Sequence, residues 1–141
     1  MDRVDRVDST RLAAMSFFAT LAPSDLAQIA DRATEVEAND GEALATEGDF
    51  GYALYAIESG TADVTSDGRV IRTLGPGDVF GEIAVLASGR RTATVTATSA
   101  MRLLALFKRD VWKLESDCPD VAQRLRALIA ERQAATASTS Q

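Results

Sequence analysis

Hydrophobic and polar positions follow two different periods along this chain, and the changes between them divide it into three regions. Over residues 11–33 and 108–133 apolar side chains recur at the spacing of one face of an α-helix. Over residues 34–107 they form short runs that alternate with polar residues and are cut by glycine and aspartate, as in β-strands. The charged segment 1–10 is expected to be a disordered leader, and the small polar segment 134–141 a disordered tail.

The central region predicts an antiparallel β-barrel or jelly roll, a double-stranded β-helix, because many short strands follow one another at near-regular spacing. The clearest turn is Asp67-Gly68, since this dipeptide between two alternating runs is typical of a two-residue hairpin. The expected strands are 34–38, 42–46, 53–59, 61–66, 69–74, 92–98 and 101–107. The fold class is therefore α+β, with one domain over residues 11–133: helices over 11–33, the barrel over 34–107 and helices over 108–133.

The flanking helices carry their own sequence markers. Pro23 separates two helical runs over residues 12–33, and the second should pack one apolar face on the core. After the barrel, a short helix over 109–117 carries Trp112, which is expected to anchor it on the core. Pro119 then occupies the first turn of a longer amphipathic helix, where proline is well tolerated. The apolar stripe of that helix consists of Val121, Leu125, Leu128 and Ile129.

Composition narrows the functions that this fold could serve. The net charge of −6 and the presence of only two lysines argue against a nucleic-acid polymer as partner. The complete lack of histidine excludes histidine-based nucleophile systems, imidazole bases and histidine-bound zinc, so neither an enzyme nor a metal site is expected. No apolar run is long enough for membrane insertion. Cys118 is the only cysteine, which favours a reducing, cytoplasmic location and an unreactive thiol.

The stretch FGEIAVLASGRRTATVTA, residues 80–97, holds the most distinctive chemistry of the chain. Gly81 can adopt backbone conformations closed to other residues and lets a ligand approach the main chain. The apolar residues that follow could form one helical turn, whose first N–H groups favour an anion. Arg91 could add a forked guanidinium suited to phosphate. Glu82, beside this anion site, could accept hydrogen bonds from the hydroxyls of a ribose. A dinucleotide loop fits less well, because Pro76 occupies the tight turn and no βαβ unit follows.

This stretch resembles the phosphate-binding cassette of cyclic nucleotide-binding domains, whose pattern is F-G-E followed, after a short gap, by R-x-A-[TS]-V-x-A. The resemblance extends over residues 17–132 and includes three further matches in the family's order: GEALATEGD at 41–49, YAIESGTADV at 55–64 and LGPGDVFGE at 74–82. It implies a module that binds cAMP or cGMP as ligand, with no other cofactor. It also implies that the C-terminal helix closes over the base as a lid and that its rearrangement transmits the signal.

Carried over position by position, the resemblance implies that Glu82 accepts the ribose 2′-hydroxyl and Arg91 pairs with the cyclic phosphate. Gly81 and the backbone N–H groups of neighbouring residues would line the same pocket; these neighbours are Ile83, Ala84 and Ala93. Arg90 departs from the family's usual proline or small residue and is expected on the surface. Thr92 stands where many cAMP receptors have alanine; its hydroxyl resembles cGMP-preferring members, although cAMP is favoured here.

Several choices stay open at the level of sequence. The residue that caps the base could be any of Leu125, Leu128, Ile129 and Arg132. The output could pass through an effector protein or a fused effector domain, and a homodimer is a further alternative. The chain could also be a protein-interaction scaffold that keeps the fold without the ligand, although a retained Glu82 and Arg91 would then leave buried charge uncompensated.

Overall fold

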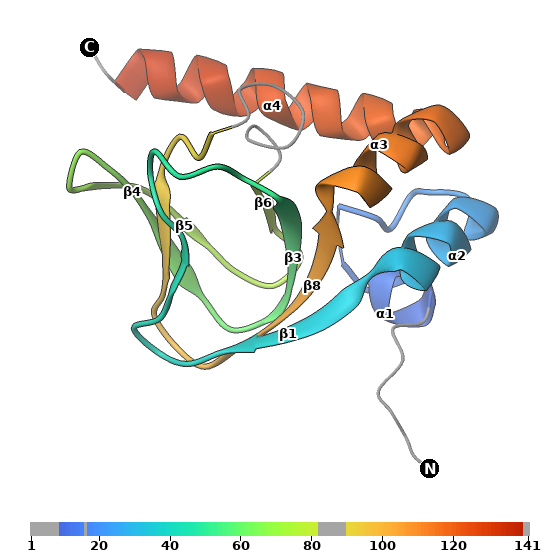
Figure 1. Ribbon diagram of the computed structural model, residues 1–141, viewed down its shortest axis with the longest axis horizontal. Coiled ribbons are helices and arrows are strands. Elements are labelled where there is room, and N and C mark those ends of the chain that lie inside the picture. The colour runs from blue at the N-terminus through green and yellow to red at the C-terminus, as the bar shows by residue number, and fades with distance from the viewer. Residues whose placement is uncertain (1–8, 16, 82–89, 140–141) are drawn as a thin grey trace.

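The computed structural model describes residues 9–15, 17–81 and 90–139, which form two β-sheets with helices packed beside them (Figure 1). The helices are α1 (Ser9–Ala13), α2 (Pro23–Arg32), α3 (Lys108–Asp117) and α4 (Pro119–Thr139). The strands are β1 (Thr34–Ala38), β2 (Ala43–Ala45), β3 (Ala53–Ser59), β4 (Ala62–Ser66), β5 (Arg69–Leu74), β6 (Val79–Phe80), β7 (Thr94–Ala97) and β8 (Met101–Phe107). The order helices, strands, helices is thus confirmed.

The described strands form two four-stranded antiparallel sheets, in the orders β1-β8-β3-β6 and β2-β7-β4-β5. The pairing is nested: β1 pairs with β8 and β2 with β7, while β4 lies between β7 and β5. This is the topology of a jelly roll built from two facing sheets. The expected α+β fold is therefore confirmed, in the form of two sheets rather than one continuous barrel.

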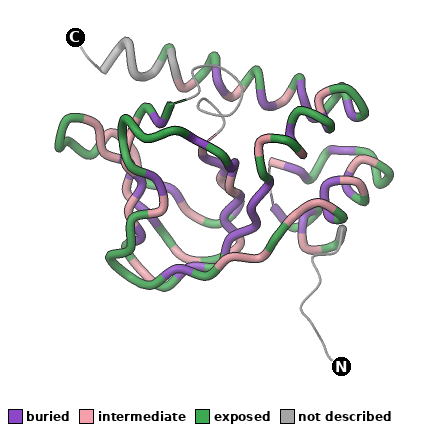
Figure 2. Tube along the Cα trace, in the orientation of Figure 1, coloured by how far each residue is buried: buried purple, intermediate pink, exposed green. Residues whose placement is uncertain are grey.

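The sheet β1-β8-β3-β6 is buried on both faces, which explains why its central strands are almost continuously apolar. Alternate residues of β3 point to opposite sides, so Leu54 and Ala56 join the core on the helix side, and Ile57 joins the core between the sheets. Leu103 of β8 and Val95 of β7 belong to the second core. Figure 2 shows the buried residues concentrated along β3 and β8. One face of this sheet therefore packs on the helices, and its other face lines the space between the two sheets.

The Asp67-Gly68 hairpin between β4 and β5 is confirmed. Ser66 pairs with Arg69 across a two-residue loop, and both loop residues have positive φ, 52° at Asp67 and 76° at Gly68. Positive φ at both central positions is the hallmark of the type I′ turn that suits the strand twist.

The first expected helix is shorter than the sequence predicts. Its apolar run over residues 12–21 is helical only to Ala13; beyond it, backbone N–H groups bond three residues back, from Met15 to Leu12, Phe18 to Met15 and Leu21 to Phe18. Such bonds make tight turns instead of a continuous α-helix. The turns still bury the apolar side chains of Leu12, Met15 and Phe18.

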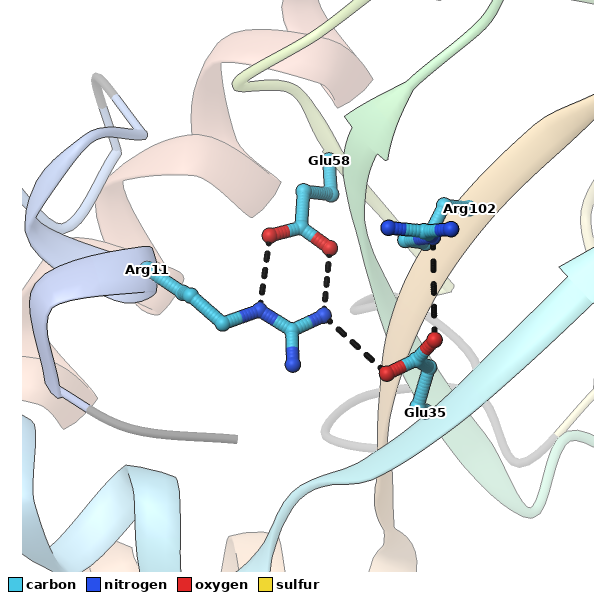
Figure 3. Close-up of polar contacts among 4 residues, drawn as sticks. All are labelled: Arg11, Glu35, Glu58 and Arg102. Carbon is cyan, nitrogen blue, oxygen red and sulfur yellow. Dashed lines mark hydrogen bonds and ion pairs between the residues drawn. The ribbon is translucent and has the colours of Figure 1, made fainter. Parts of the chain in front are cut away.

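Arg11 fastens α1 to the sheet (Figure 3). Its Nε and Nη2 donate to the two carboxylate oxygens of Glu58 in β3, at 2.8 and 2.5 Å, and Nη2 also donates to Glu35 of β1 at 3.2 Å. Glu35 in turn lies 3.6 Å from Arg102 of β8. The hydrogen bond to Glu58 raises the pKa of the Arg11 guanidinium above its ordinary value. The cluster ties three strands to the N-terminal helix.

The two C-terminal helices differ from expectation in length and in one side chain. The helix α4 continues to Thr139, so most of the expected disordered tail over 134–141 is helical. In α3, Val111 and Leu114 are buried, but Trp112 is 53% exposed, so the expectation that it anchors the helix on the core is wrong. One residue is about 100° of helical rotation, which turns Trp112 away when Val111 faces inward. In α4, Val121, Leu125 and Ile129 are buried as the stripe predicts. No helix in the described residues is long and apolar enough to span a membrane.

Candidate functional site

Arg91 is fixed by its main chain just before β7. Its backbone N–H donates to the carbonyl of Asp49 at 2.6 Å, and its own carbonyl accepts from the N–H of Gly48 at 2.9 Å. The N–H of Glu47 donates to Oγ1 of Thr94 at 3.0 Å, which continues the same attachment. The segment 47–49 therefore holds the start of β7, and the side chain of Arg91 leaves a backbone that is bonded on both sides.

The guanidinium of Arg91 lies inside the protein. The residue is only 9% exposed and is the one charged residue in the buried class among those described. Its Nη2 donates to the carbonyl of Ala53 at 2.9 Å, in the first residue of β3. A guanidinium has five N–H donors, and this bond uses one of them. Burial strengthens its attraction for an anion, because the effective dielectric constant falls away from water.

Two stacked aromatic rings, those of Tyr55 and Phe80, lie near the guanidinium of Arg91. The guanidinium carbon of Arg91 is 5.9 Å from the centre of the Tyr55 ring, within the range of a cation–π contact. Tyr55 stacks on Phe80 with ring centres 5.1 Å apart. Neither ring was among the site residues expected from the sequence. Their positions could have been inferred, since Tyr55 alternates with Leu54 and Ala56 and so faces the space between the sheets.

Gly81 approaches Arg91 as only glycine can. Its φ is +90°, a conformation that side-chain-bearing residues rarely adopt. A Cβ at this position would lie 2.5 Å from Nη1 of Arg91 and 2.8 Å from the carbonyl oxygen of Ala53. Both the turn and the close approach therefore require glycine, and this second residue of the cassette lies directly against the arginine.

The remaining predicted site residues divide into two groups. Thr92 is exposed and Ala93 half-buried, on the stretch that joins Arg91 to β7. Glu82, Ile83 and Ala84 lie outside the described residues. The described structure thus brings Gly81 and Arg91 together, and the ligand-binding roles of all seven residues stay predictions.

Arg90 lies on the surface, as expected from the motif alignment. It is exposed, its Nη1 donates to the carbonyl of Gly48 at 2.9 Å, and its guanidinium carbon lies 4.2 Å from the centre of the Phe50 ring. Two adjacent arginines therefore have different environments, one packed on an exposed ring and one buried. Of these two arginines, only Arg91 has its side chain inside the fold.

A second place to consider for a ligand is a hollow of about 480 Å³ between α1 and the turn before β6, lined by Thr10, Arg11, Ala14, Met15, Glu58, Pro76 and Gly77. Its cation is Arg11, whose charge is matched by Glu58 and Glu35. An anion placed there would meet these carboxylates, so the hollow does not suit a phosphate. Among the described residues, no group of three potential metal-binding side chains occurs either.

The candidate base-capping residues of α4 are mostly engaged in packing. Leu125 is buried in the core on the helix side, Leu128 packs against that core, and Ile129 is 9% exposed. Arg124 holds the same helix to the N-terminal turns: its Nη1 donates to Oγ1 of Thr20 at 2.8 Å, and its guanidinium carbon lies 5.1 Å from the Phe17 ring centre. These contacts fix α4 in the described arrangement and do not select a capping residue.

Comparison with known proteins gives a family match over most of this fold. The model of the cyclic nucleotide-binding domain matches residues 35–117, which run from β1 to the end of α3. The cyclic AMP receptor protein of Thermus thermophilus is 38% identical over 97 residues, covering 65% of this chain and 45% of that protein. The cAMP-dependent protein kinase regulatory subunit of Yarrowia lipolytica is 43% identical over 83 residues, covering 57% of this chain and 22% of that protein.

A comparison of this fold with solved structures agrees with the family match. The solved structure titled "Sp-2Cl-cAMPS bound to PKAR CBD2" superposes with a TM-score of 0.82 at 24% identity, covering 94% of this chain and 88% of that one. At this identity the likeness shows the fold alone. The chain spans less than half the length of the cyclic AMP receptor protein and of the protein kinase regulatory subunit.

Proposed function

This chain belongs to the cyclic nucleotide-binding domain family, and from that premise we propose that it binds cAMP through Arg91 and acts as a regulatory module. The family is one of receptor and regulatory domains, not of catalysts. One observation carries the proposal: within the matched segment, a buried arginine lies against a glycine whose backbone conformation and missing Cβ permit the contact.

In this proposal Arg91 pairs with the cyclic phosphate. The bond to Ala53 fixes the direction of the guanidinium, and such preorganisation lowers the entropy lost when an anion binds. A forked guanidinium can donate two parallel hydrogen bonds to two phosphate oxygens. Gly81 would bring the main chain of the cassette to the same phosphate.

The other contacts follow from the family motif. Glu82 accepts the ribose 2′-hydroxyl, while the backbone N–H groups of Ile83, Ala84 and Ala93 line the phosphate and the sugar. The exposed hydroxyl of Thr92 is the feature that could favour cGMP, because it can reach the amino group of a guanine base. We propose cAMP as the preferred ligand, since the two relatives described above are named for cAMP.

The signal would pass through α4. This helix packs on α3 and is bonded to Thr20 through Arg124, so any shift of α4 must also change contacts with the N-terminal turns. A ligand that contacts α4 in one arrangement only would shift the population towards it. Amide hydrogen exchange of residues 119–132, with and without ligand, tests this point; unchanged protection would refute it. An effector protein, a fused effector domain or a second copy would receive the change.

The decisive experiment is isothermal titration of the nucleotide-stripped protein with cAMP and cGMP. Arg91→Ala should weaken binding by about two to three orders of magnitude, because it strands a desolvated phosphate at a cost of about 3–5 kcal/mol. Arg90→Ala is the matched control and should cost less than about 1 kcal/mol, as expected for a surface charge. Equal losses at both positions would contradict the assignment of Arg91.

The alternative is a scaffold that keeps the fold without the ligand. Folded, stripped protein that binds neither nucleotide would establish it. Thr92→Ala provides a further measurement, because loss of the hydroxyl should lower affinity for cGMP more than for cAMP.

A cytoplasmic location remains the expectation from the single, unpaired Cys118.

A further inference from the structure

Four large aromatic side chains are exposed on two neighbouring segments. Of the five exposed large hydrophobic residues described, four belong to the segment before β3, to the end of β8 and to the first turns of α3: Phe50, Tyr52, Phe107 and Trp112, which are 48–65% exposed. The fifth, Val70, lies in β5 of the other sheet. We call the four aromatic residues the aromatic surface.

Several contacts link the two segments that carry the aromatic surface. The rings of Phe50 and Tyr52 have centres 6.4 Å apart. The carbonyl of Tyr52 accepts from the N–H of Lys108 at 2.7 Å, which brings the start of α3 beside the segment before β3. The Lys108 Nζ lies 5.3 Å from the centre of the Trp112 ring. The two segments therefore lie side by side although they are distant in the sequence.

The segments that carry the aromatic surface have an excess of positive charge, on a protein that is negative overall. The segments 49–52 and 107–113, together with Arg90, carry four cations against two carboxylates, Asp49 and Asp110. The cations are Arg90, Lys108, Arg109 and Lys113, which include both lysines of the chain. Because the whole chain has a net charge of −6, this local excess is complementary to an acidic partner.

The size of the aromatic surface fits the centre of a protein interface. An aromatic side chain buries about 150–250 Å², so four half-exposed rings offer on the order of 400 Å². This is the size of the largest apolar patch on a typical monomer, which is often functional. A stable interface buries about 800 Å² per partner, with aromatic anchors at its centre and a polar rim. The rings would supply the centre and the cations the rim.

We propose that the aromatic surface binds an acidic polypeptide segment that carries an aromatic or large aliphatic anchor. Phe50, Tyr52 and Trp112 receive the anchor, and the surrounding cations pair with its carboxylates. A nucleic-acid partner is disfavoured, since the net charge of −6 opposes a polyanion. A membrane surface is disfavoured for the same reason: like a nucleic acid, an anionic membrane presents many more negative charges than a short acidic segment, so the net charge of −6 opposes it more strongly.

The test uses the full, nucleotide-stripped chain, so it does not depend on the proposed ligand. The probe is a fluorescently labelled synthetic peptide in which glutamates flank two phenylalanines, with a lysine-for-glutamate peptide as control. Fluorescence anisotropy should show saturable binding of the acidic peptide that weakens as salt is raised, because the charge contribution is screened. The lysine peptide should bind at least about tenfold more weakly, which corresponds to ~1.4 kcal/mol.

Matched variants locate the site. Trp112→Ser and Lys108→Glu should each weaken binding of the acidic peptide at least about fivefold. Val70→Ser and Arg69→Glu remove the same kinds of exposed group from β5 and should leave binding unchanged. Circular dichroism checks that every variant is folded. Equal effects of both sets, no saturable binding of the acidic peptide, or preferential binding to vesicles of anionic lipid would each overturn the proposal.

Discussion

Replacing Gly81 by alanine tests whether this residue is glycine because of Arg91. The substitution adds one Cβ at φ +90°, which costs about 1–2 kcal/mol in backbone strain. The same Cβ would lie 2.5 Å from Nη1 of Arg91 and 2.8 Å from the carbonyl oxygen of Ala53, so the guanidinium must move. Moving it endangers the bond from Nη2 to Ala53, and hydrogen bonds of charged groups contribute about 1.5–3 kcal/mol.

Gly41→Ala supplies the matched control. Gly41 has a φ of +89°, almost identical to that of Gly81, but a Cβ there would have no neighbour within 4 Å. Gly41→Ala should therefore cost only the backbone strain. Gly81→Ala should lower the free energy of unfolding by about 2.5–5 kcal/mol, the sum of the strain and the lost bond.

Thermal unfolding and titration with cAMP measure the two effects separately. A chain of this size loses roughly 3–5 °C in melting temperature for each kcal/mol, so the two variants should be clearly resolved. Displacement of Arg91 should also reduce nucleotide affinity by at least about tenfold, ~1.4 kcal/mol, in Gly81→Ala alone. Equal melting temperatures and equal affinities of the two variants would refute the role assigned to the contact.

Three further predictions concern stability. Arg11→Met should lower the free energy of unfolding by about 1–2 kcal/mol, because Glu58 and Glu35 lose a shared cation in a partly buried place; an unchanged melting temperature would contradict this. Leu103→Ala should cost about 2–5 kcal/mol in urea unfolding, since Leu103 is fully buried between the sheets; a cost near zero would mean that the core collapses around it. Burial, and secondarily a hydrogen bond with Asp25, raises the pKa of the Cys118 thiol, so its stabilising effect is present below about pH 8.5 and is lost as pH rises through the folded-state pKa. The alkaline loss of stability should therefore be smaller in Cys118→Ala, and a thiol reagent should label Cys118 only as the protein unfolds.

Most of the strands could be predicted from the sequence, because alternation and glycine-containing turns are local features. The Asp67-Gly68 turn fixed one hairpin, and the expected strand over 101–107 agrees with β8 in both bounds. The two-residue strand β6 was missed, since Val79 and Phe80 lie in an apolar run too short to show alternation. Apart from that hairpin, the pairing of the strands was not predicted, because periodicity alone does not say which strands are neighbours.

The site could be predicted only in part. The motif identified Arg91 and Gly81, but the bond to Ala53 and the Tyr55–Phe80 pair depend on strands brought together by the fold. Trp112 was misassigned because a large aromatic residue in an amphipathic helix is usually buried. The register of Val111 and Leu114 decides its orientation, and this register follows from the packing of α3 on the sheet.

The nested strand pairing has a consequence for how the domain is made. Thr34 pairs with Ala105, and Ala43 with Thr96, so the first strands of the jelly roll are completed by nearly the last. During synthesis, β1 therefore cannot pair with β8 until the chain has left the ribosome beyond residue 107. Until then, other contacts must keep the apolar residues of β1 from water. Distant pairings of this kind delay folding, because the entropy of closing long loops is lost before the contacts form. The hairpin between β4 and β5, which needs no distant partner, should be the first piece of sheet to form during synthesis.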